Sequence, residues 1–164
     1  MPEHTARPLA PAFALRDQCG RTVRRTDFSG RWLVLYVYPE ADTPACTTQA
    51  CEFQSALTGL ASLRAAVAGI SPDEPPQLAA FAARFGLSFP LLSDPPGADG
   101  VPATIAALGA WGPKVLYGRR SIGLIRTTVI IDPVGRIAAR FANVRAKGHA
   151  ARMASALRSL VDAG

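Results

Sequence analysis

The chain has 164 residues, of which 49% are hydrophobic and 18% are charged, and this balance predicts a single globular domain over residues 1–164. No stretch approaches the roughly 20 consecutive apolar residues of a membrane-spanning helix, and the first 13 residues lack the apolar segment of a secretory signal, so we expect a cytoplasmic protein without a membrane partner. The formal net charge is +6, but basic residues do not run together with aromatic residues, so we expect a solvated basic surface and no nucleic-acid partner.

Two short β-like segments, residues 13–16 and 22–24, stand on either side of a turn at residues 17–20. They predict an N-terminal β-hairpin. Cys19 lies in the turn, and we expect it to be inert, with a secondary redox or crosslinking role as the alternative.

The next segment reads as a strand, a turn and a helix. Residues 32–38 form a short run rich in β-branched and aromatic side chains, which predicts a buried strand that ends at Pro39. Residues 45–63 contain no proline and carry apolar side chains at helical spacing. Thr43 is the expected N-cap of this helix, and Pro44 suits its first position, where a missing N–H group costs nothing.

Cys46 falls in the first turn of this predicted helix. Unpaired backbone N–H groups and the positive end of the helix dipole favour a negative charge there, so the thiol should lose its proton more easily. Because the thiolate is the reactive form, the arrangement suits nucleophilic chemistry. The alternative is a buried structural cysteine.

Cys51 follows five residues after Cys46. In an intact helix the two Cα atoms would lie roughly 8.6 Å apart, whereas a disulfide bridge needs less than about 7 Å. The pair therefore cannot be a static bridge within a regular helix, but it could close if the first turns unwound. This spacing suits a disulfide that forms and breaks with a change of conformation better than a permanent structural disulfide.

The rest of the chain alternates between strand and helix patterns. Buried strands are predicted at residues 65–70 and 126–132, with a return strand at 136–141, and helices at residues 77–85 and 147–161. The alternation in the first half predicts a core of parallel strands joined by right-handed crossovers. Residues 95–112 show no clear helix or strand pattern, apart from a helical turn or two predicted at 102–108. Residues 117–120 are predicted to form a basic loop.

The cysteine and histidine counts bear on cofactors. Three cysteines at irregular spacing make a poor disulfide framework and fit a reducing compartment. A zinc site needs about four ligands, and the two histidines, His4 and His149, stand near the two ends of the chain without ligand spacing. We therefore expect no metal site and no other cofactor.

The segment YPEADTPACTTQACEF, residues 38–53, contains the pattern Pro39-x-x-x-Thr43-x-x-Cys46. This pattern resembles the active-site signature of peroxiredoxins, and the whole segment is similar to the subfamily called PrxQ or bacterioferritin comigratory protein. Residues 69–73 (GISPD) and 86–94 (GLSFPLLSD) resemble that family as well. The resemblance covers about residues 6–162 and implies an α/β, thioredoxin-like fold, with a central mixed sheet flanked by helices.

The resemblance also implies a function. Cys46 would attack hydrogen peroxide or an organic hydroperoxide, and Cys51 would resolve the resulting sulfenic acid within the same chain. Thioredoxin or a similar dithiol would then reduce the disulfide, and the protein would work as a monomer. Two departures are visible: Ala45 stands where the subfamily has glycine, and residues 95–112 are longer than usual, with Trp111 either near the active-site mouth or in ordinary packing.

Further site residues come from the same resemblance. Arg126, in the segment GLIRTT, matches the family's active-site arginine and would stabilise the thiolate and the peroxide oxygens. Thr43 and the backbone N–H of Cys46 would also donate hydrogen bonds to the oxygens, and Pro39 would shield the thiolate from water. Glu52 is a weaker candidate, as an ion-pair partner that orients Arg126.

Two other classes of function are compatible with a reactive cysteine. A thiol-based redox sensor would use the same cysteine pair and signal through a changed partner contact. A thioredoxin-like oxidoreductase is disfavoured because the chain contains no C-x-x-C motif.

Overall fold

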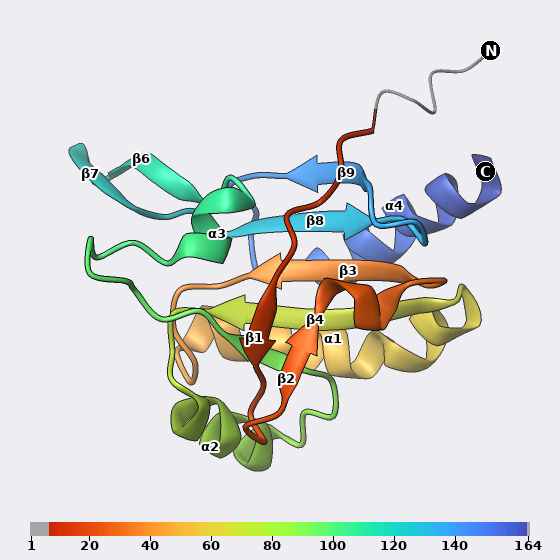
Figure 1. Cartoon of the computed structure of the whole chain (residues 1–164), viewed down its shortest axis with the longest axis horizontal. Helices are drawn as coiled ribbons and strands as arrows, with labels where there is room; N and C mark the ends of the chain where they lie inside the picture. The colour runs from red at the N-terminus through yellow and green to blue at the C-terminus, as the bar shows by residue number, and fades with distance from the viewer. Residues whose placement is uncertain (1–6, 164) are drawn as a thin grey trace.

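The computed structural model describes residues 7–163. His4 lies outside the described residues. A seven-stranded sheet forms the centre, in the order β2-β1-β5-β4-β3-β8-β9, and a separate two-stranded sheet joins β6 to β7 (Figure 1). The strands are β1 (Ala14–Arg16), β2 (Thr22–Arg24), β3 (Trp32–Val37), β4 (Ala65–Ser71), β5 (Leu91–Ser93), β6 (Trp111–Leu116), β7 (Arg119–Leu124), β8 (Thr127–Ile131) and β9 (Ile137–Phe141). The helices are α1 (Pro44–Ser62), α2 (Pro75–Phe85), α3 (Ala103–Ala107) and α4 (His149–Ala163), with a short 3₁₀ turn, η2 (Arg25–Phe28).

The sheet is mixed, as predicted. Strand β3 pairs parallel with β4, and β4 pairs parallel with β5, whereas β8 runs antiparallel to both β3 and β9. Strands β1 and β2 form the predicted N-terminal hairpin, which joins the sheet antiparallel to β5. The α/β architecture expected from the sequence, a mixed sheet flanked by helices, is confirmed.

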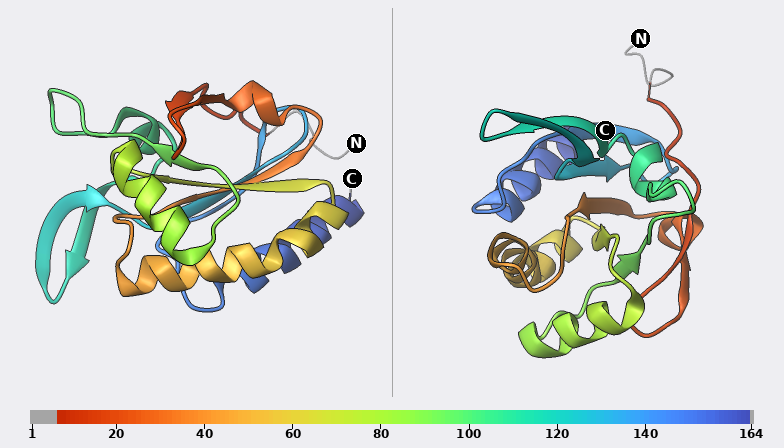
Figure 2. Two further views of the ribbon diagram at one scale, coloured as in Figure 1. Left: turned by 90° about the horizontal axis from the view of Figure 1, so that it is seen from below. Right: turned by 90° about the vertical axis from the view of Figure 1, so that its left-hand side faces the viewer.

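Alternate residues of β3 divide the core into two layers. Val34 and Tyr36 face a cluster that also contains buried side chains of α1, α2 and α4, while Leu33, Leu35 and Val37 face the other side. That second cluster is closed by the N-terminal segment, η2 and α3. Figure 2 shows the three long helices on one side of the sheet and α3 on the other, with α1 and α4 side by side. A period of two along a strand buried on both faces explains the continuous apolar run.

Most element boundaries agree with the sequence analysis, and one segment does not. Helix α2 begins two residues before the predicted start, because Pro75 and Pro76 suit its first turn, and it ends at Gly86 with φ of 64°. The predicted basic loop at residues 117–120 is wrong. Residues 117–118 instead form the two-residue turn of the β6–β7 hairpin, and both have positive φ, 51° and 76°.

The β6–β7 hairpin extends from the end of the sheet at which α1 begins (Figures 1 and 2). Trp111, at the start of β6, is partly buried and packs against the core cluster on the α3 side of the sheet, so its contacts are those of ordinary packing. Within residues 7–163, none of the helices has both the length and the apolar character needed to cross a membrane.

Candidate active site

Cys46 lies in the first turn of α1, as predicted. Thr43 is the N-cap, with φ −89° and ψ 156°, and Pro44 occupies the first helical position. The Cys46 side chain is only 1% exposed. The Thr43 hydroxyl does not cap the helix; it donates a hydrogen bond to the Glu40 carbonyl oxygen at 2.8 Å and so fixes the turn before α1.

Hydrogen bonds to the segment around the end of β4 fix the turn between β3 and α1. The backbone N–H of Ala41 donates to the Asp73 carboxylate at 2.7 Å, and the Ser71 hydroxyl donates to the same oxygen at 2.9 Å. Asp42, with φ of 63°, pairs with Arg84 of α2 at 2.7 Å. Because both members of that ion pair are well exposed, it contributes less than about 1 kcal/mol, and the partly buried Asp73 bonds are the stronger constraint on the turn.

Arg126 reaches Cys46 from the residue just before β8. Its Nη2 donates to Cys46 Sγ at 3.2 Å, and its Nη1 donates to Gln49 Oε1 at 2.5 Å. Gln49 is fully buried and lies three residues after Cys46, on the same face of α1. A guanidinium at this distance stabilises a thiolate by a charge-assisted hydrogen bond, and Gln49 fixes the orientation of that guanidinium.

Glu52 does not orient Arg126, so that prediction is wrong. The Glu52 carboxylate instead accepts the backbone N–H of Gly148, at 2.9 and 3.1 Å, immediately before α4 begins. Gln49, rather than Glu52, is the residue of α1 that orients Arg126. The sequence carried a signal for it, since residues three apart on a helix share a face, whereas a residue six positions away is turned to another side.

The structure brings most of the predicted site residues together. Thr43 and Cys46 lie together at the helix start, and Arg126, just before β8 and 80 residues after Cys46, contacts the Cys46 sulfur. Pro39 lies at the exposed beginning of the same turn. Cys51 lies further along α1, half-buried and unpaired, and the helix is continuous through both cysteines. This geometry is that of a reduced cysteine pair.

Buried polar groups line the protein interior beneath this site. Among the described residues, four buried side-chain atoms have no hydrogen-bond partner: Tyr36 Oη, Tyr38 Oη, Gln49 Nε2 and His149 Nδ1. The Tyr36 ring stacks on Phe53 of α1, with ring centres 4.6 Å apart. Burial raises the pKa of Tyr36 well above its usual value, so its hydroxyl keeps its proton.

His149, the first residue of α4, is fully buried in the same region. Its Nε2 lies 2.7 Å from the Thr128 hydroxyl. Burial, with smaller contributions from the positive charges of Arg152 and Arg126, lowers the pKa of His149 to about 4. The imidazole is therefore neutral at neutral pH.

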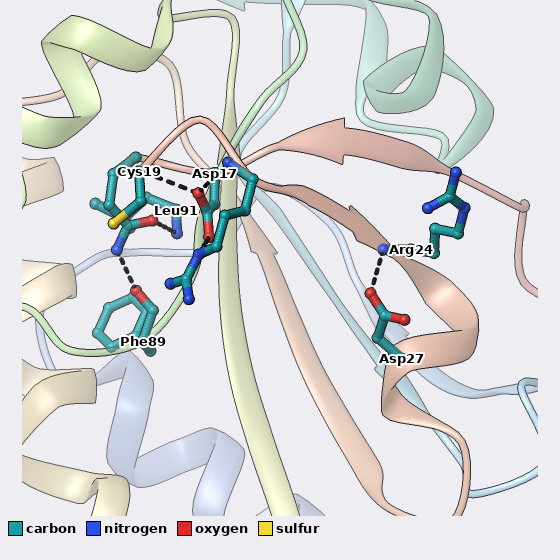
Figure 3. Close-up of polar contacts among 8 residues, drawn as sticks. Asp17, Cys19, Arg24, Asp27, Phe89 and Leu91 are labelled. Carbon is teal, nitrogen blue, oxygen red and sulfur yellow. Dashed lines mark hydrogen bonds and ion pairs between the residues drawn. The ribbon is translucent and has the colours of Figure 1, made fainter.

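Cys19 lies away from this site. It is exposed in the β1–β2 turn, and two strands, β5 and β4, separate β1 from β3. Figure 3 shows how the turn is built: the Cys19 backbone N–H donates to Asp17 Oδ1 at 2.8 Å, and Gln18 bridges to the backbone of Phe89 and Leu91. The turn depends on Asp17 and Gln18 rather than on the thiol.

Residues 7–163 contain no group of three or more His, Cys, Asp or Glu side chains arranged to hold a metal ion. The groups that the site does present are the Cys46 thiol, the Arg126 guanidinium and the hydrogen-bond donors of the helix start.

Comparisons with known proteins agree on a single family. Residues 7–140 match the model of the AhpC/TSA family. A putative peroxiredoxin of Mycobacterium tuberculosis is 44% identical over 144 residues, which cover 88% of both chains. The peroxiredoxin Bcp of Bacillus subtilis is 35% identical over 153 residues, which cover 93% of this chain and 92% of that one. Among solved structures, the bacterioferritin comigratory protein of Xanthomonas campestris superposes with a TM-score of 0.81 at 29% identity, covering 91% of this chain and 92% of that one.

Proposed function

The chain belongs to the AhpC/TSA family and is a peroxiredoxin of the Bcp or PrxQ type, a thiol-dependent peroxidase with a thioredoxin-like fold, and we propose that Cys46 is its peroxidatic cysteine. The observation that carries this assignment is the hydrogen bond from Arg126 Nη2 to Cys46 Sγ at 3.2 Å, in the first turn of a helix. Cys46 is the one described cysteine that combines a helix start with a guanidinium.

The first step follows from charge. The Cys46 thiolate attacks one peroxide oxygen; the S–O bond forms, the O–O bond breaks, and the departing oxygen takes a proton and leaves as water or an alcohol. Negative charge develops on that oxygen, so donors must meet it there. Arg126 and the backbone N–H of Cys46 can supply them, and Thr43 does so when its hydroxyl turns away from Glu40. Pro39, next to the turn, limits the access of water.

The second step regenerates the site. The Cys51 sulfur attacks the sulfenic acid on Cys46, so that an S–S bond forms, the S–O bond breaks and water leaves before irreversible oxidation can follow. A thioredoxin-type dithiol then reduces the bridge. Because both cysteines belong to one chain, a monomer completes the cycle. We assign the cycle to the cytoplasm, where a dithiol pool keeps such cysteines reduced.

The substrates we propose are hydrogen peroxide and organic hydroperoxides. The Xanthomonas campestris relative was studied for alkyl peroxide reduction, which supports the organic class. The redox-sensor alternative is not favoured, because the relatives are named peroxiredoxins.

The test is peroxide consumption with thioredoxin, its reductase and NADPH as the electron source. Cys46→Ser should abolish turnover, and Cys51→Ser should allow one turnover and then stop with thioredoxin as the reductant. Cys19→Ser is the matched control and should keep the wild-type rate, since Cys19 lies away from the site. Full activity in the Cys46 variant, or loss of activity in the Cys19 variant, would overturn the assignment.

A further inference from the structure

One side of α1 faces a groove that the peroxidase chemistry leaves unexplained. Pro44, Thr48, Cys51 and Ser55 recur at intervals of three or four residues and lie along this side of the helix. Residues 145–148 and the start of α4 form the opposite wall. Two hollows of about 460 Å³ each follow one another along this seam, the first beside the turn that carries Cys46 and the second containing Cys51.

The wall opposite α1 is positively charged. Arg145, Lys147 and Arg152 are all exposed on it. The Arg152 guanidinium donates to the carbonyl oxygens of Arg145 at 2.8 Å and Lys147 at 3.1 Å, so the shape of this loop is fixed and the three charges are gathered together.

One carboxylate lines the two hollows, that of Glu52. It is already bound to the backbone N–H of Gly148 at the start of α4. Apart from Cys51 and Glu52, the second hollow is lined by small side chains, including Ala56, Ala150 and Ala151. A partner's backbone can therefore approach closely, and carboxylates on that partner would meet the basic wall.

We propose that this groove is the docking surface for the protein dithiol that reduces the Cys46–Cys51 bridge, and that the partner carries carboxylates around its reactive cysteine. The inference rests on the proposed function. Its support is that a half-buried thiol in an apolar hollow and a cluster of exposed basic side chains lie along one groove. Closing the bridge requires only the first turns of α1 to unwind, so the opposite wall, at residues 145–148 and the start of α4, remains.

Reduction of the bridge takes two thiol–disulfide exchange steps. A partner thiolate attacks Cys51 Sγ, the bridge breaks, and Cys46 leaves as the thiolate that Arg126 stabilises. The partner's second thiol then attacks the sulfur of the partner's first cysteine, which is bonded to Cys51 in the mixed disulfide, and Cys51 is released. The partner ends as a disulfide, and its two hydrogens have passed to the two cysteines of this chain.

The charge of the wall is tested by reversing it. The probe is an acidic bacterial thioredoxin with its reductase and NADPH, and dithiothreitol serves as a small reductant that needs no docking surface. The double variant Arg145→Glu, Lys147→Glu should lower kcat/KM for thioredoxin at least tenfold at low salt, whereas peroxide consumption driven by dithiothreitol should keep the wild-type rate. Added salt should weaken the wild-type reaction with thioredoxin more than that of the variant.

The matched control is Arg119→Glu, Arg158→Glu, which changes the net charge equally at exposed positions outside the groove. It should leave both rates unchanged. An unchanged thioredoxin rate in the groove variant, or an equal fall in the control, would overturn the proposal. Absence of any peroxide consumption by the wild-type protein with dithiothreitol would instead count against the proposed function, so the two failures are distinguishable.

The hollow itself is tested by filling it. Ala151 is exposed at the start of α4, so Ala151→Trp should obstruct the groove without disturbing the core, and Ala163→Trp at the far end of the same helix is its control. The first should slow reduction by thioredoxin alone, and the second should slow neither reductant. A thioredoxin that retains only its attacking cysteine should be trapped on Cys51, and trapping on Cys46 would overturn the proposed order of attack.

Discussion

Glu52 ties the two helices of the site together: its carboxylate accepts the backbone N–H of Gly148 at 2.9 and 3.1 Å. The carboxylate belongs to α1, one residue after Cys51, and the N–H group belongs to the residue before α4. A negative charge at a helix start is favourable because it meets unpaired N–H groups and the positive end of the dipole. The second cysteine of the pair therefore lies next to the contact that begins α4.

The first prediction concerns this contact. Glu52→Ala should lower the free energy of unfolding by about 1–2 kcal/mol, because it leaves the Gly148 N–H without its partner. Glu52→Gln keeps an acceptor and removes only the charge, so it should cost less, about 0.3–1 kcal/mol. Urea unfolding followed by circular dichroism measures both. Equal stability of all three proteins would show that the contact contributes nothing.

The second prediction concerns Arg126. Arg126→Met keeps much of the side-chain length and removes the donor to Cys46 Sγ. The second-order rate with hydrogen peroxide should fall at least tenfold, which corresponds to about 1.4 kcal/mol. Alkylation of Cys46 by iodoacetamide at neutral pH should slow as well, because the reacting sulfur has lost its charge-assisted hydrogen bond.

Arg120→Met provides a control for Arg126→Met, since Arg120 is an exposed arginine of the β6–β7 hairpin. It should react at the wild-type rate. If the two variants behave alike, the guanidinium beside Cys46 has no part in the reaction.

The third prediction concerns pH and His149. The pKa of His149 is lowered to about 4 in the folded protein, chiefly by burial, from an ordinary value near 6.5. Between these two values the imidazole is protonated in the unfolded chain but neutral in the folded chain. The free energy of unfolding therefore rises with pH across this window and falls as pH drops from about 6.5 towards 4. The loss should be on the order of 2–3 kcal/mol.

His149→Gln isolates this contribution, because the variant lacks the titrating ring while every carboxylate is retained. Urea unfolding at several pH values between 4 and 7 should give a smaller loss of stability for the variant than for the wild type. Parallel pH profiles would mean that the imidazole is protonated equally in the folded and unfolded chains.

The fourth prediction concerns the first turns of α1. An intact helix separates the Cys46 and Cys51 Cα atoms by roughly 8.6 Å, and a bridge tolerates at most about 7 Å. Amide hydrogen exchange over residues 44–56 should therefore be faster in the oxidised protein than in the reduced protein. Strand β8 should exchange equally slowly in both states and serves as the internal reference. Equal protection of residues 44–56, with the bridge verified by mass spectrometry, would contradict this unwinding.

The sequence was most informative where local patterns decide the structure. The apolar run at β3, the proline at the first position of α1 and the glycine after α2 each act within a few residues, and each predicted its element correctly. Cys46 was located by the same kind of signal, since the start of a helix is a local feature.

What the sequence did not reveal depends on longer range or on uncommon backbone geometry. The hydrogen bond from Ala41 to Asp73 spans 32 residues and has no local signature. The β6–β7 hairpin turns at Tyr117, a residue type that rarely adopts positive φ, and β6 contains Pro113, which is unusual in strands. Glu52 was predicted as the partner of Arg126 because of its charge, but position along the helix decides the contact, and Gln49 makes it.

The contact between Arg126 and Cys46 closes a loop of 80 residues. A contact between such distant parts of the chain forms only after the intervening strands have found one another, which is slow and costly in entropy. The thiol and the guanidinium are thus brought together by the completed sheet rather than by either segment alone. Reactivity of Cys46 towards peroxide would consequently report on completion of folding: a refolding chain should regain α1 signal first and fast peroxide reduction last.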